Sequence, residues 1–93
     1  MISEKDKTFL LEIARKYQVK RLILFGSASK SSGKNRDIDL AVDGLPDKKF
    51  FKFYSELIFG LSQPVDLVDI SKKTKFTEIL TSEGVQIYGW SQI

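Results

Sequence analysis

Two carboxylates separated by one residue, Asp37 and Asp39, follow soon after the pair Gly26–Ser27. Side chains two positions apart on an extended strand point to the same face, so these carboxylates would project together. Mg²⁺ prefers such oxygen ligands and commonly takes one or two carboxylates together with phosphates. Gly26 lets a phosphate approach the backbone because it has no side chain, and the Ser27 hydroxyl can donate to phosphate oxygens. The stretch is therefore typical of a site for a metal-bound phosphate.

A third carboxylate, Asp66, lies in the apolar run 64–70. If this run forms a strand beside the strand of Asp37 and Asp39, the three carboxylates converge and repel one another unless cations neutralise them. Two Mg²⁺ ions bound close together stabilise both the attacking and the leaving oxygen in an in-line displacement at phosphorus. We therefore predict that Asp37, Asp39 and Asp66 bind the metals and carry the catalysis.

The loop between the glycine and the carboxylates carries basic side chains. Lys30, Lys34 and Arg36 could each add positive charge beside a phosphate, although solvated loop charges are the simpler interpretation. Among them we assign Lys34 to phosphate binding, together with Gly26 and Ser27. Each feature of the site has an ordinary explanation when taken alone, since an Asp-x-Asp is often a turn or a solvated strand edge. The prediction rests on the joint pattern.

The composition limits the possible chemistry and partners. The 93 residues contain no cysteine and no histidine, which excludes disulfides, thiolate nucleophiles, Ser-His-Asp catalysis and nearly all ordinary zinc sites. The net charge of +3 comes from dispersed lysines, so a nucleic-acid partner is not expected. No apolar run is long enough to span a membrane, and the first residues lack the apolar stretch of a signal peptide. We therefore expect a cytoplasmic protein.

Hydrophobic periodicity and turn residues predict an order of α-β-β-α-β-α along one domain, 1–93. A capping box of Ser3 and Asp6 predicts the start of the first helix. We expect helices over 3–17, 47–60 and 71–82, strands over 19–25, 37–43 and 64–70, and a short strand or docked tail over 85–90.

These elements predict an α/β (α+β) fold, in which a small mixed sheet packs against helices. The first two strands are joined by a loop too short for a crossover helix, so they should pair antiparallel. The third strand returns through the helix 47–60 and should run parallel to the second. Ile38, Leu40 and Val42 should face one side of the sheet, opposite to the two carboxylates of the same strand.

Two helices carry large apolar side chains whose burial can be predicted. The helix 47–60 is rich in aromatic residues, and we interpret it as core, with a partner surface as the alternative. On the last helix, Phe76, Ile79 and Leu80 are expected to face inward. Exposed aromatics within 50–54 or 88–90 could support an interface in a homo- or hetero-oligomer.

Three segments resemble the DNA polymerase β-type nucleotidyltransferase superfamily. They are 24–27 (LFGS), 37–40 (DIDL) and 65–68 (VDLV). More narrowly, they resemble the minimal nucleotidyltransferases of that superfamily, the MntA-type partners of HEPN-domain proteins. The resemblance extends over 19–88, and the helix before it also fits.

The resemblance implies the nucleotidyltransferase fold and an Mg²⁺-dependent transfer of a nucleoside monophosphate, AMP from ATP in this group, to a hydroxyl with release of pyrophosphate. It implies that Asp37 and Asp39 bind the metals and the triphosphate, and that Asp66 ligates the catalytic metal and helps to deprotonate the acceptor. Gly26 and Ser27 would hold the β- and γ-phosphates. It also implies a partner, a HEPN toxin ribonuclease that is silenced when its tyrosine is adenylylated.

The chain departs from the family pattern between the two halves of the motif. Nine residues, Ala28 to Arg36, separate Gly-Ser from Asp-x-Asp where the family usually has ten, and Arg36 stands where the family often has serine. Arg36 could pair with Asp37 or with a phosphate. Family members that modify antibiotics, tRNA or glutamine synthetase use extra domains to bind the acceptor, and 93 residues leave no room for one.

We therefore expect a second subunit or a partner protein to hold the acceptor. Three functions remain open at this stage. They are adenylylation of a HEPN toxin, nucleotidyl transfer to a small molecule or an RNA end, and neutralisation of a partner by contact without catalysis.

Overall fold

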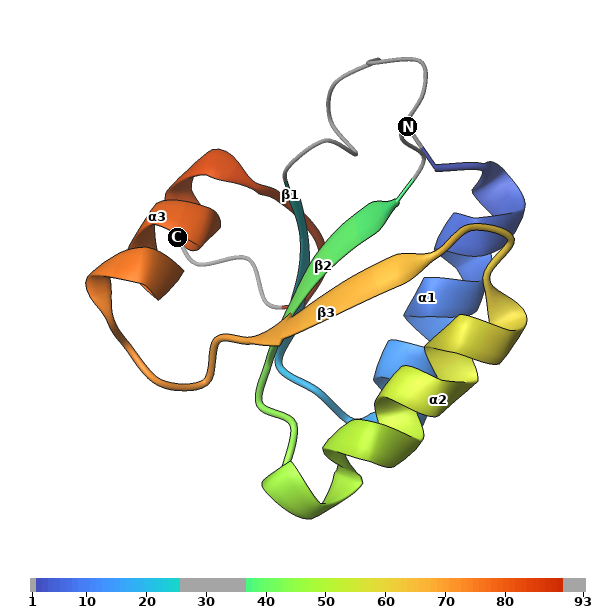
Figure 1. Cartoon of the computed structure of the whole chain (residues 1–93), viewed down its shortest axis with the longest axis horizontal. Coiled ribbons are helices and arrows are strands. Elements are labelled where there is room, and N and C mark those ends of the chain that lie inside the picture. The colour runs from blue at the N-terminus through green and yellow to red at the C-terminus, as the bar shows by residue number, and fades with distance from the viewer. Residues whose placement is uncertain (1, 26–36, 90–93) are drawn as a thin grey trace.

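Helices and strands alternate around one mixed β-sheet in the computed structural model, which describes residues 2–25 and 37–89 (Figure 1). The elements, in chain order, are α1 (Glu4–Tyr17), β1 (Arg21–Phe25), β2 (Ile38–Asp43), the 3₁₀ turn η2 (Asp47–Lys49), α2 (Phe50–Gly60), β3 (Val65–Asp69), α3 (Lys75–Glu83) and β4 (Val85–Gly89). The predicted order is confirmed, and the segment 85–89 is a strand rather than a docked tail. No helix of the described residues is both long and apolar enough to cross a membrane.

The sheet has the strand order β3-β2-β1-β4. As predicted, β1 and β2 pair antiparallel, with Leu24 opposite Leu40, and β3 runs parallel to β2. The last strand, β4, adds to the free edge of β1 in antiparallel orientation. The two strands that carry the predicted carboxylates are therefore direct neighbours.

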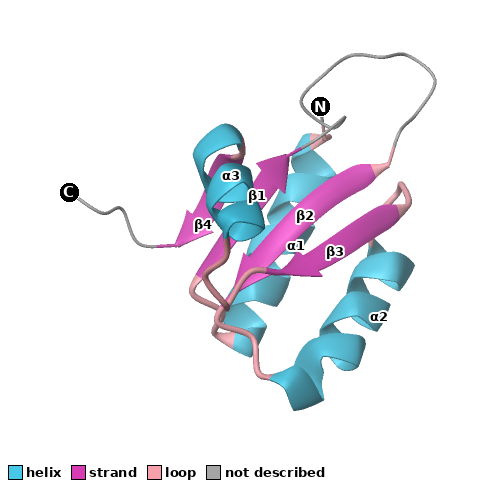
Figure 2. Ribbon diagram, turned by 60° about the vertical axis from the view of Figure 1, so that its left-hand side comes forward, coloured by secondary structure: helices cyan, strands magenta, loops and turns pink. Residues whose placement is uncertain are grey.

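Helices cover the two faces of the sheet unequally (Figure 2). Helices α1 and α2 pack on one face, where the strands contribute Leu22, Ile38, Leu40 and Val42 to a continuous buried core. Helix α3 lies on the other face over a smaller group of buried residues, which comprises Ile23, Ala41, Ile70 and Leu80. The alternation of β2 between these two groups confirms the predicted faces of that strand.

Two predictions of burial are wrong in part. Helix α2 buries Phe53 and Leu57, but Phe51 and Ile58 are 79% and 56% exposed, because a helix on one side of a sheet can bury only a stripe of its surface. Helix α3 is rotated so that Thr77 and Leu80 face the sheet. Its Phe76 and Ile79, predicted to face inward, are exposed.

The start of α1 also differs from the prediction. The Ser3 hydroxyl accepts a hydrogen bond from the Asp6 backbone N–H at 3.1 Å, which is the expected N-cap. The Asp6 carboxylate, however, is buried and accepts from the backbone N–H and the hydroxyl of Ser62, at 3.2 and 2.5 Å. The capping box is thus replaced by a bond that ties the start of α1 to the segment between α2 and β3.

Candidate active site

Two of the predicted carboxylates occupy matching positions on neighbouring strands. Asp39 of β2 pairs in register with Asp66 of β3 in the parallel ladder. Side chains at matching positions of adjacent strands point to the same face of a sheet. Asp39 and Asp66 therefore project side by side, as the sequence predicted from the parallel arrangement of their strands.

The face that carries these carboxylates is the face of α3. Ile38 and Leu40, on either side of Asp39, are buried in the core under α1 and α2, so Asp39 points to the opposite side. Asp66 is exposed and Asp39 is partly buried, which leaves this part of the sheet accessible. Solvent access of this kind suits a group that must meet a substrate.

The carboxylates lie at the end of the sheet where β1 stops and β2 and β3 begin. Phe25, the last residue of β1, is opposite Asp39 in the antiparallel ladder. The parallel ladder starts one residue earlier, where the Ile38 backbone N–H donates to the Pro64 carbonyl oxygen at 2.8 Å. In the sequence, Gly26 and Ser27 follow Phe25 directly.

The third predicted carboxylate, Asp37, precedes the first residue of β2 and is partly buried. Alternation along the strand places it on the side of Asp39. Within residues 2–25 and 37–89, no three acidic side chains come close enough together to form a metal-binding group. The structure thus brings Asp39 and Asp66 into register, but it does not gather all three carboxylates.

Three predicted phosphate-binding residues, Gly26, Ser27 and Lys34, lie outside the described residues, as does Arg36. The donor set that is described consists of carboxylate oxygens on two adjacent strands. Hard oxygen donors of this type match the preference of Mg²⁺, which completes its coordination with water and substrate phosphates. The residues present therefore fit a magnesium site that the nucleotide itself would complete.

A hydrogen bond that sequence reasoning missed supports the strand of Asp66. The Tyr54 hydroxyl of α2 donates to the backbone carbonyl oxygen of Val65 at 3.0 Å. Val65 immediately precedes Asp66 and pairs with Ile38 in the ladder. Tyr54 is therefore a candidate positioning residue. No local pattern could have indicated it, because the bond depends on how α2 packs on the sheet.

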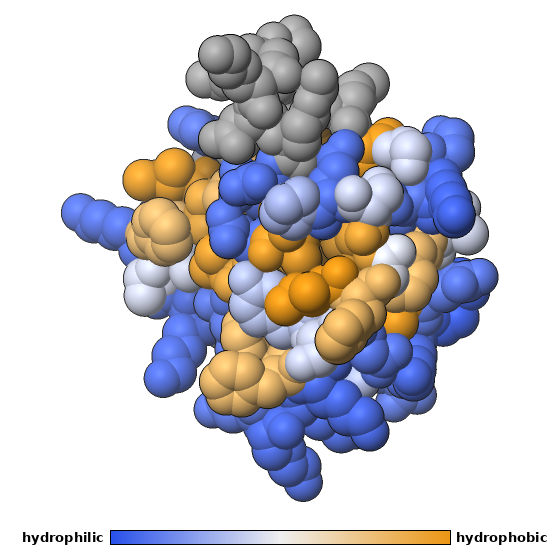
Figure 3. Space-filling view, turned by 45° about the vertical axis from the view of Figure 1, so that its right-hand side comes forward, coloured by the Kyte–Doolittle hydropathy of each residue, from blue (hydrophilic) through white to orange (hydrophobic). Residues whose placement is uncertain are grey.

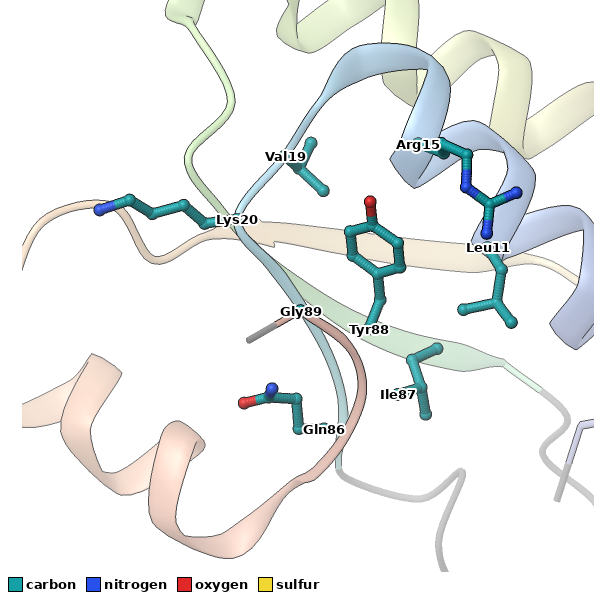
Figure 4. A pocket seen from close by; sticks show the side chains of 8 residues that line it. All are labelled: Leu11, Arg15, Val19, Lys20, Gln86, Ile87, Tyr88 and Gly89. Atoms are coloured by element: carbon teal, nitrogen blue, oxygen red, sulfur yellow. The ribbon is translucent and has the colours of Figure 1, made fainter. Parts of the chain in front are cut away.

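An open hollow of about 690 Å³ lies away from the carboxylates, between α1 and β4 (Figure 4). Tyr88 projects from β4 toward α1, and Leu11 and Arg15 border the hollow on the helix side. None of its lining residues is one of the predicted site residues. The candidate active site is thus identified by the register of its carboxylates and not by the shape of the surface.

The fold is similar to that of several solved structures. A chain of the MntA–HepT toxin–antitoxin crystal structure aligns with a TM-score of 0.70 and 21% identity, over 95% of this chain and 74% of that chain. A toxin–antitoxin structure with AMP-PNP gives a TM-score of 0.71 and 24% identity, over 95% and 75%. At these identities the similarity shows the fold.

A third structure is a tri-AMPylated Shewanella oneidensis HEPN toxin in complex with the MNT antitoxin. It aligns with a TM-score of 0.69 and 24% identity, over 91% of this chain and 71% of that chain. No curated protein matches the chain closely in sequence. The family model described as polymerase beta, nucleotidyltransferase matches residues 9–93. Since this match covers most of the sequence, the chain belongs to the polymerase β nucleotidyltransferase family.

Proposed function

We propose that this chain is an Mg²⁺-dependent nucleotidyltransferase that transfers AMP from ATP to a hydroxyl group of a partner protein. The observation that carries the proposal is the in-register pair Asp39 and Asp66, on accessible sheet surface, in a chain of this family. In the transfer, the acceptor oxygen bonds to the α-phosphorus, the bond from that phosphorus to the bridging oxygen of the β-phosphate breaks, and pyrophosphate leaves.

The carboxylates have separate roles in this proposal. Asp37 and Asp39 would hold Mg²⁺ together with the triphosphate. Asp66 would complete the metal site and take the proton of the attacking hydroxyl. Bound Mg²⁺ supplies charge neutralisation at the attacking and leaving oxygens. Gly26 and Ser27 hold the β- and γ-phosphates through backbone N–H and hydroxyl donors, because glycine permits the close approach.

The proposed partner is a HEPN toxin, with this chain as its antitoxin. Structural neighbours include a tri-AMPylated HEPN toxin in complex with the MNT antitoxin and a toxin–antitoxin structure with AMP-PNP. In this proposal the toxin itself brings its hydroxyl to the carboxylates. The proposal also implies a cytoplasmic location, where ATP and Mg²⁺ are abundant.

The test is to incubate the chain with Mg²⁺, ATP labelled at the α-phosphorus, and the product of the neighbouring gene, which the proposal expects to be a HEPN protein. We expect label on the HEPN protein, and no label when the γ-phosphorus carries it instead. Asp37→Asn or Asp39→Asn should abolish the labelling. Label found only on RNA or a small molecule would contradict the choice of acceptor. Neutralisation of the toxin that survives both substitutions would contradict catalysis as the mechanism.

A further inference from the structure

In the described part of the chain, helix α2 exposes an apolar surface on its outer side. Phe51, Ile58 and Phe59 are 79%, 56% and 88% exposed, although they are among the largest hydrophobic side chains of the chain. With Ser55 they form what we call the α2 stripe, because positions 51, 55, 58 and 59 share one side of a helix. Figure 3 looks onto this side of the molecule and shows apolar surface bordered by hydrophilic side chains.

The spacing of the α2 stripe is symmetric about Ser55. Phe51 and Phe59 lie four residues before and four residues after it, and Lys52 and Ile58 lie three residues before and after. If two α2 helices cross antiparallel at Ser55, each Phe51 meets the Phe59 of the other copy. The aliphatic stem of each Lys52 then lies along the partner copy's Phe59, with the ammonium in water. Such self-complementarity is the requirement for a two-fold interface.

Charge on α2 also favours antiparallel pairing with a second copy. Lys48, Lys49 and Lys52 lie at the N-terminal end, and the last turn of the helix has no basic residue. Carbonyl groups at the C-terminal end of a helix carry partial negative charge. Antiparallel pairing places the lysines of each copy beside the C-terminal end of the other, whereas parallel pairing would bring all the lysines together.

The area of the α2 stripe suits a weak dimer. From the exposed fractions, Phe51, Ile58 and Phe59 present on the order of 400 Å² of apolar surface in each copy. Two copies would bury roughly 800 Å² from these side chains alone, and the lysine stems and the rim add to it. The total approaches the roughly 1,000 Å² that a specific interface requires.

The α2 stripe is also independent of the candidate active site. Helix α2 packs on the face of the sheet opposite to Asp39 and Asp66 (Figure 2). A second copy on the outer side of α2 would therefore leave both sets of carboxylates accessible. From these observations we infer that the chain self-associates as a two-fold dimer through antiparallel pairing of α2.

Sedimentation equilibrium tests the inference on the full chain alone. We expect the dimer fraction to rise between about 10 µM and 1 mM, the range of weak transient interfaces. Phe51→Glu and Phe59→Glu should each weaken association by about 30-fold or more, because they place a charge in the centre of the interface. Phe76→Glu is the matched control, since Phe76 is 60% exposed on α3 and should not affect association.

A single cysteine tests the geometry, because the natural chain has none. The residue at the two-fold axis should form an intermolecular disulfide on mild oxidation, so Ser55→Cys should give a covalent dimer. Ser82→Cys, exposed on α3, should give no covalent dimer at the same concentration. A chain that stays monomeric at 1 mM (about 10 mg/mL for a small domain) would overturn the inference, as would dimers that persist in both phenylalanine variants.

Discussion

Asp66 and Asp69 lie on the same short strand but have different surroundings. Asp66 shares its face with Asp39, its register partner, whereas the odd spacing turns Asp69 to the other side. One Asp69 oxygen also accepts a hydrogen bond from the Ser71 backbone N–H at 2.9 Å. Position along β3 therefore separates a carboxylate that can serve the site from one that fixes a turn.

This difference predicts the outcome of two matched substitutions. Asp66→Asn should lower the rate of AMP transfer by about 100-fold or more, because it removes a proton acceptor and a metal ligand at once. Asp69→Asn keeps an oxygen that can accept from Ser71 and should leave the rate unchanged. Single-turnover assays, with urea unfolding of each variant, would measure this. Full activity in Asp66→Asn would contradict the assigned role.

Single residues also show what the sequence could reveal. That Asp39 and Asp66 lie on adjacent strands could be predicted, because a crossover through a helix makes the third strand parallel to the second. The hydrogen bond from Tyr54 to Val65 could not, because it joins two elements whose contact is set by packing. Local pattern thus locates the carboxylates, and tertiary packing decides what holds them in place.

At the scale of elements, Tyr54 links α2 to the start of β3. Tyr54→Phe keeps the ring and removes the hydrogen bond to the Val65 carbonyl, so it should cost about 1 kcal/mol of unfolding free energy. Because Val65 precedes Asp66, we also expect a several-fold lower kcat with little change in KM for ATP. Tyr17→Phe is the control, because the Tyr17 hydroxyl donates to Glu56 of α2 and not to the backbone of β3. Equal kcat values for the two variants would rule out a positioning role.

The contact between α1 and α2 predicts a loss of stability at alkaline pH. Burial raises the pKa of Tyr17 to about 12, and the hydrogen bond to Glu56 and the negative charge of that carboxylate act in the same direction. In the unfolded chain a tyrosine has a pKa near 10. At a pH between these two pKa values, the folded chain binds more protons than the unfolded chain. The stabilisation that Tyr17 contributes is therefore complete below about pH 10 and is lost toward about pH 12.

Urea unfolding at a series of pH values from 9 to 11.5, a window set by these pKa values, measures that loss. The unfolding free energy of the natural chain should fall more steeply than that of Tyr17→Phe, which cannot ionise at this position. The lysines titrate in both proteins, so their effect on the unfolding free energy cancels in the comparison. Parallel curves for the two proteins would show that Tyr17 does not ionise differently on folding.

Helix α3 shows why the side that a short helix buries is difficult to predict. Its start is fixed by Thr74 and Thr77, since each side chain accepts from the backbone N–H of the other, at 3.1 and 2.8 Å. The Thr77 hydroxyl also donates to a backbone carbonyl and is buried with Leu80. A satisfied polar group therefore faces the sheet, and Phe76 turns outward. Hydropathy alone would predict that Phe76 is buried and that Thr77 is exposed.

At the scale of the whole molecule, the two faces of the sheet differ in how much core they carry and in how accessible they are. The face of α1 and α2 contains the larger core, and the face of α3 leaves the carboxylates accessible. The layered α/β architecture was predictable from periodicity and connection lengths. The outer surface of α2 was not, because the sequence of an apolar helix does not show how much of it the rest of the chain can cover.

Two phenylalanines of α2 test whether its inner side is core and its outer side is exposed in the monomer. Phe53 is fully buried and packs edge-on against Tyr17, with ring centroids 5.2 Å apart, whereas Phe59 is 88% exposed. Phe53→Ala should lower the unfolding free energy by about 3–5 kcal/mol, a large part of the stability of a small domain. Phe59→Ala should change it by less than about 0.5 kcal/mol.

Urea unfolding below about 5 µM, where a weak dimer dissociates, measures both. A similar loss in the two variants would mean that the outer side of α2 packs within the monomer, and the dimer inferred from the α2 stripe would lose its basis.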